Sequence, residues 1–132
     1  MNKAAIIIDP ELPLGFLANA IACITSGLFV DGQDFVGPEI QGQGITYIPI
    51  TKIPILILKP GKKSLQELCK EARSLNLKYM AFTRQAQSTT DYTAYEKSIT
   101  GLPLESITLV GLGVIGPEKL VNSLVGSLPM LR

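Results

Sequence analysis

The sequence predicts an α/β protein in which strands and helices alternate around a parallel or mixed sheet. Three observations support this fold class. Apolar runs of strand length recur along the chain, and segments with helical spacing lie between them. Glycines and prolines separate the segments. The 132 residues contain no internal repeat and no linker of low complexity, so we expect a single domain over residues 1–132.

Composition and charge exclude several classes of protein. Hydrophobic residues make up 46% of the chain and charged residues 17%, which is typical of a folded core and not of a disordered chain. The net charge of +1 creates no overall field for nucleic acid. The chain has no histidine, which removes histidine-based triads and most zinc sites, and we expect no metal. Cys23 and Cys69 lie far apart in sequence and outside metal-ligand spacing. Two free cysteines fit a reducing cytoplasm better than a disulfide framework.

The N-terminal part of the chain predicts a buried strand followed by a helix. Residues 3–9 are an apolar run that ends at Asp9. Prolines interrupt the chain before a helix over 14–26, which we expect Gly27 to close. Because apolar residues occur all round this helix, we expect it to be covered on most sides.

Residues 12–30 form an uncharged stretch of nineteen residues, which is long enough to be considered as a membrane span. Asp9 and Glu11 at its start are opposite in sign to the basic flank of a signal peptide. Helix breakers and polar residues leave about a dozen good helical residues, fewer than the ~20 that a span needs. We therefore expect a cytoplasmic protein without membrane association.

The middle of the chain predicts more strands, loops and two helices. Three apolar runs of strand length lie at 45–50, 53–58 and 78–83, the first an edge strand because it contains a proline. Polar or glycine-rich stretches predict loops at 31–44 and 84–90. Residues 91–99 predict a helix. Another helix begins at Ser64 and Glu67, which have the spacing of a capping box, and it should bury a face formed by Leu65, Leu68, Cys69 and Ala72.

Residues 106–124 predict a strand that leads into a helix after a Gly-Pro pair. They contain a GxGxxG motif at 111–116. A dinucleotide fingerprint needs a further βαβ segment and an acidic residue about 20 positions on. Sixteen residues (132 − 116) follow the motif, and none after Glu118 is acidic. We therefore expect no NAD, FAD or ATP as cofactor, and we interpret the glycines as thinning a strand where another backbone packs closely or as lining a pocket.

Polar residues at predicted strand ends form the candidate site. In open α/β sheets, ligands bind beyond the carboxyl ends of the strands. Asp9 ends the first strand, and Thr83 and Arg84 end the third, with Gln87 just beyond and Asn19 on the first helix. These five residues are the candidate ligand-binding set for a small molecule or peptide. Asp9 and Arg84 would form a charge pair or an anion clamp there, and ordinary loop polarity is the alternative.

Charge is distributed unevenly along the chain. Residues 59–78 carry six basic and two acidic side chains, whereas residues 1–50 carry one basic and five acidic ones. Such asymmetry can steer a polyanion such as RNA, but a solvated helix face is the better explanation. RNA and a homodimeric state both stay open.

The stretches at 5–20, 78–95 and 109–132 together resemble an uncharacterised bacterial family whose fold is like that of the type II peptidyl-tRNA hydrolases. The resemblance implies a three-layer α/β/α sandwich with a mixed, about four-stranded sheet. Relative to the enzymes, Gly15 and Arg84 match, the motif lysine is missing, and Ala81 stands where an aspartate is expected. Peptidyl-tRNA cleavage should therefore be weak or absent.

The sequence leaves the type of function open. A ligand-binding protein without catalysis is one hypothesis. A hydrolase of an ester or amide is the alternative, with Asp9 positioning water and Arg84 or Thr83 stabilising the oxyanion. A scaffold subunit is the third.

Overall fold

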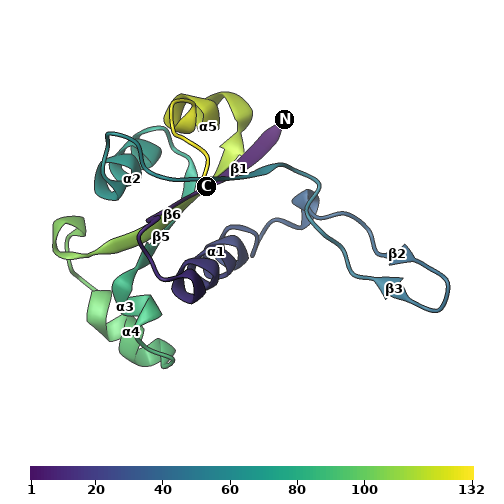
Figure 1. The fold of residues 1–132 in the computed structure, drawn as a ribbon, viewed down its shortest axis with the longest axis horizontal. Helices are drawn as coiled ribbons and strands as arrows, with labels where there is room; N and C mark the ends of the chain where they lie inside the picture. The colour runs from purple at the N-terminus through teal and green to yellow at the C-terminus, as the bar shows by residue number, and fades with distance from the viewer.

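A mixed four-stranded sheet forms the centre of the fold. The computed structural model describes residues 1–132, apart from the side chain of Gln33. The strand order is β4-β1-β6-β5 (Figure 1). β1 is parallel to β4, and β6 is antiparallel to both β1 and β5, so β1, β4 and β5 run in one direction. The strands span Asn2–Ile8 (β1), Ile55–Leu58 (β4), Lys78–Thr83 (β5) and Leu109–Pro117 (β6).

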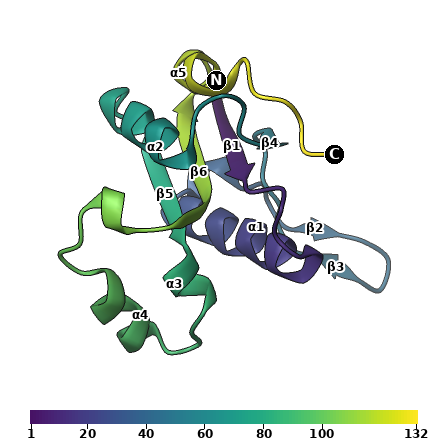
Figure 2. The same ribbon diagram turned by 60° about the vertical axis from the view of Figure 1, so that its left-hand side comes forward.

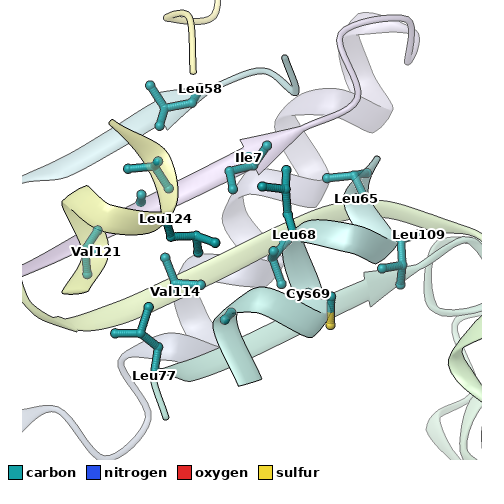
Figure 3. Close-up of a cluster of buried hydrophobic side chains, with 14 residues drawn as sticks. Ile7, Leu58, Leu65, Leu68, Cys69, Leu77, Leu109, Val114, Val121 and Leu124 are labelled. Carbon is teal, nitrogen blue, oxygen red and sulfur yellow. The ribbon is translucent and has the colours of Figure 1, made fainter. Parts of the chain in front are cut away.

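Helices cover both faces of the sheet, as Figures 1 and 2 show. Helix α1 (Leu14–Leu28) packs on one face, and helices α2 (Leu65–Ser74) and α5 (Glu118–Val125) pack on the other. Figure 3 shows the buried apolar cluster on the face covered by α2 and α5. There Leu68 of α2 and Leu124 of α5 pack with side chains of β1 and β6. The expected mixed α/β architecture is confirmed.

Helix α2 matches its prediction closely. The Ser64 hydroxyl accepts a hydrogen bond from the Glu67 amide at 3.1 Å, and the Glu67 carboxylate accepts one from the Ser64 amide at 3.3 Å. This capping box satisfies two amides that the first turn leaves unpaired. The four residues expected on the inner face are all buried: Leu65, Leu68, Cys69 and Ala72.

The GxGxxG motif lies within strand β6. A Cβ on Gly111 would stand 2.7 Å from Ile24 Cδ1, and one on Gly113 would stand 2.7 Å from Leu28 Cδ1. The two glycines therefore let α1 pack closely on the sheet, which confirms the structural interpretation of the motif.

Helix α1 corrects two expectations. It continues through Gly27 to Leu28, because Gly27 keeps a helical backbone and the Phe29 amide still donates to the Thr25 carbonyl at 3.1 Å. The helix is also not covered on most sides. Only Ala20, Ile24 and Leu28 are buried, since the sheet can cover just one face of a helix that lies on it.

The stretch expected as a polar loop at 84–90 begins with a helical turn, α3 (Arg84–Gln87). The Thr83 hydroxyl caps it by accepting a hydrogen bond from the Ala86 amide at 3.1 Å. Helix α4 (Tyr92–Ile99) follows with Asp91 as its N-cap, close to the predicted bounds. None of its eight described residues is buried. A short 3₁₀ turn, η2 (Leu104–Ser106), leads into β6.

The edge strand expected at 45–50 is not part of the main sheet. Strands β2 (Ile40–Gln41) and β3 (Thr46–Tyr47) pair with each other as an antiparallel hairpin. Together with the 3₁₀ turn η1 (Gln33–Phe35), this hairpin belongs to a long excursion between α1 and β4. Figure 1 shows the hairpin standing clear of the body. The expectation was wrong because apolar content identifies a strand but not its pairing partner.

Within the part of the chain that the structure describes, no helix combines the length and apolar character that crossing a membrane requires.

Candidate functional site

The structure places Asp9, Thr83 and Arg84 at the same edge of the sheet. The Asp9 amide donates to the Val110 carbonyl at 3.0 Å, and the Arg84 amide donates to the Thr108 carbonyl at 3.0 Å. Both residues therefore flank the start of β6, at the carboxyl ends of β1 and β5. This grouping follows from the shared direction of the two strands, as the sequence predicted.

The side chains of these residues make local contacts. One Asp9 oxygen accepts a hydrogen bond from the Glu11 amide at 3.0 Å, and the buried Thr83 hydroxyl caps α3. Arg84 is exposed to solvent. Among the described side chains no ion pair joins Asp9 to Arg84. The predicted charge pair is therefore not formed, because each group finds a local partner or solvent.

The other two predicted residues, Asn19 and Gln87, line one hollow of about 430 Å³. It opens between the start of α1 and α3, at the same edge of the sheet. The Gln87 side-chain amide donates to the Phe16 carbonyl at 2.8 Å and so ties α3 to α1. The remaining lining comes from Pro13, Gly15 and Phe16, so that the whole lining is uncharged.

A second hollow of about 230 Å³ also involves α1 and α3. Its lining includes Cys23 on α1 and Ala86 on α3, which neighbour Asn19 and Gln87 of the first hollow. The Cys23 thiol donates to the Asn19 side-chain oxygen at 3.8 Å, one helical turn away. We call the two hollows together the α1–α3 groove. Phe82, Tyr92 and Tyr95 add apolar surface, and Asp91 is the single charged residue of the lining.

Sequence reasoning did not identify Phe16 or Cys23 as groove residues. Both belong to a helix that was expected to be covered, so their apolar character was assigned to the core. The signal that could have found them is their spacing with Asn19. Positions 16, 19 and 23 share one helix face, which borders the buried stripe of Ala20 and Ile24.

Gln85 on α3 is a further residue that sequence reasoning missed. Its side-chain oxygen is buried, and no described atom donates a hydrogen bond to it. A buried acceptor without a donor is a costly arrangement. It adjoins Ala86 of the groove in sequence.

Two hollows on the opposite face of the sheet are larger, at about 470 and 550 Å³. The first contains the exposed ion pair between Lys70 and Glu105, at 2.9 Å, which lowers the pKa of the Glu105 carboxyl. It also contains Cys69, whose thiol pKa is raised by burial. Both hollows lie against α2 and are lined by solvated charges, so the smaller, more apolar groove at the strand ends is the better candidate.

Comparison with known proteins identifies a family for the chain. No functionally curated protein matches it significantly. Among solved structures, it is similar to a protein of unknown function, Atu0240, from Agrobacterium tumefaciens strain C58, with a TM-score of 0.89 and 15% sequence identity. That similarity covers 99% of this chain and 98% of the other, and at this identity it concerns the fold alone. The family model described as "Protein of unknown function (DUF2000)" matches residues 2–132, and the chain therefore belongs to the DUF2000 family.

Proposed function

We propose that the protein binds a small, uncharged ligand rich in amide groups, such as a short peptide segment, in the α1–α3 groove. The observation that carries this proposal is the presence of two side-chain amides, Asn19 and Gln87, in a mainly apolar lining that contains a single charged residue. Ligand sites commonly combine apolar walls with a few polar groups that fix orientation.

The chemistry of the two amides favours a peptide group as ligand. Each side-chain amide offers both a donor and an acceptor, and so does a peptide unit. The Gln87 side-chain nitrogen donates to the Phe16 carbonyl, and this hydrogen bond fixes the orientation of the side chain. The Gln87 side-chain oxygen would then be the acceptor for the ligand. A charged ligand fits the groove less well, because Asp91 is the single charged residue of the lining. The Asp91 carboxylate already accepts a hydrogen bond from the Thr93 amide at 3.0 Å.

A fold like that of the type II peptidyl-tRNA hydrolases is part of this proposal, because those enzymes act on a substrate that carries a peptide. Catalysis fits the residues less well than binding does. Ala81 stands where the enzymes are expected to have an acid, and the Thr83 oxygen is occupied as a helix cap. A hydrolase would have to rely on Asp9 to orient water and on Arg84 at the rim.

A titration with N-acetyl-alanyl-alanine amide tests the proposal. We expect chemical-shift changes in ¹H–¹⁵N spectra at the side-chain amides of Asn19 and Gln87. Asn19→Ala and Gln87→Ala should each weaken binding roughly 3- to 10-fold, the loss of about one hydrogen bond. Ser123→Ala, an exposed helical position on the opposite face, is the matched control and should leave the affinity unchanged.

The same samples distinguish the alternatives. Absence of shift changes in the groove at millimolar dipeptide would reject peptide binding there. Turnover of peptidyl-tRNA or of p-nitrophenyl acetate that is lost in Asp9→Asn would instead favour the hydrolase. Arg84→Ala separates the two sites, because Arg84 lines neither hollow and should matter only for rim chemistry.

A further inference from the structure

The hairpin between α1 and β4 presents an unusual amount of uncovered apolar surface. Every residue from 38 to 50 is exposed. Five of them are large and apolar, with exposed fractions between 52% and 79%: Ile40, Ile45, Tyr47, Ile48 and Ile50. We call residues 38–50 the arm. Figures 1 and 2 both show it projecting from the end of the molecule that lies away from α3 and α4.

The arm is ordered by its own hydrogen bonds. Its strands pair Ile40 with Tyr47, and the Gly42 amide donates to the Ile45 carbonyl at 2.8 Å. At its base the Gly37 amide donates to the Ile50 carbonyl at 2.8 Å. A two-stranded hairpin alone is marginally stable in water, so an arm with this much apolar surface needs a covering surface.

The outer face of α1 is a surface that could cover it. Residues 12–30 carry no charge, although helices usually present charges to solvent. Ala18 and Ala22 form an exposed stripe of small side chains, and Leu14, which is 82% exposed, precedes them on the same face of the helix. The arm presents bulky side chains and this stripe of α1 presents small ones, and residues 40–51 also carry no charge.

We propose that two copies of the chain form a symmetric dimer in which each arm lies on the outer face of α1 of the other copy. One chain supplies both surfaces, and a two-fold axis uses each of them twice. The absence of lysine and arginine from residues 38–51 argues against an anionic membrane as the occupant, since such surfaces attract basic segments.

The apolar area of the arm is a large share of what a stable dimer interface needs from each copy. The five apolar side chains of the arm expose on the order of 500 Å², taking roughly 150 Å² for each fully exposed large side chain. That is near the upper end of the ~300–600 Å² patches that monomers leave uncovered. The α1 face adds to it, which brings each copy towards the ~800 Å² of a standard interface.

Sedimentation equilibrium of the purified full chain tests the proposal. We expect a dimer for the native sequence. Ile48→Glu, on the arm, and Ala22→Glu, on α1, should each give a monomer because each would bury an unpaired charge at both contacts. Leu102→Glu, an exposed apolar position outside the arm and α1, is the matched control and should remain dimeric.

Mixing the two variants makes the test specific for arm exchange. A heterodimer of Ile48→Glu with Ala22→Glu keeps one intact contact, between the native arm of one chain and the native α1 of the other. The mixture should therefore recover part of the dimer that neither variant forms alone. A monomeric native protein would overturn the proposal. A dimer broken by Ile48→Glu but not by Ala22→Glu would also overturn it, since arms would then pair with each other. Circular dichroism of each variant confirms that it is folded.

Discussion

Individual glycines on β6 determine how closely α1 can lie on the sheet. Gly111 and Gly113 face Ile24 and Leu28, and neither position has room for a Cβ. The structural role of these glycines was predicted from the sequence, and their position inside β6 against α1 agrees with it. The identity of the facing element could not be predicted, since it depends on tertiary packing.

Replacement of one of these glycines should destabilise the fold. Gly113→Ala would force its methyl group against Leu28 Cδ1 at 2.7 Å, and we expect a loss of about 1–3 kcal/mol in the free energy of unfolding. Urea denaturation measures it. Gly15→Ala is the control, because nothing lies within 4 Å of its Cβ and alanine favours helix, so stability should hold or rise. Equal stability of the two variants would contradict the packing role.

The two cysteines should differ strongly in reactivity. Cys69 is 4% exposed and burial raises the pKa of its thiol, whereas Cys23 is partly exposed in the groove. Only the thiolate attacks disulfide reagents, so a raised pKa slows the reaction further. We expect Ellman's reagent to label one thiol of the folded protein readily and Cys23→Ser to remove that fast phase. A fast phase that persists in Cys23→Ser would show that Cys69 is accessible.

At the scale of elements, prediction succeeded where local chemistry decides the structure. Helix α2 was predicted with its cap and its inner face because both depend on neighbours in sequence. Helix α1 was predicted, but its exposure was not, since apolar residues also serve surfaces that contact partners. The turn α3 was missed because a threonine cap in a polar stretch is also typical of a loop.

The capping box offers a test at this scale. Ser64→Ala removes the acceptor for the Glu67 amide, and we expect the free energy of unfolding to fall by about 1 kcal/mol. Ser123→Ala, at an exposed position inside α5, should cost nothing because alanine is the better helix former. Guanidinium denaturation compares the two. A Ser64 variant as stable as the Ser123 variant would mean that water caps α2 equally well.

At the scale of the whole molecule, topology brings distant residues to one edge of the sheet. The alternation of strands and helices was enough to predict that Asp9, Thr83 and Arg84 lie at one edge of the sheet, although β6 separates Asp9 from the other two. The groove itself could not be predicted, because it depends on how α1 packs against α3 and on the Gln87 hydrogen bond between them. Helix α1 takes part in both proposals: Asn19 and Cys23 line the groove, and the neighbouring stripe of Ala18 and Ala22 is the proposed contact for the arm.

The most direct test of the binding proposal is a crystal structure of the protein soaked with N-acetyl-alanyl-alanine amide. The account predicts the dipeptide in the α1–α3 groove, with a main-chain amide hydrogen-bonded to Asn19 or to the Gln87 oxygen. An empty groove at saturating dipeptide, or a dipeptide bound instead beside Asp9 and Arg84, would contradict it.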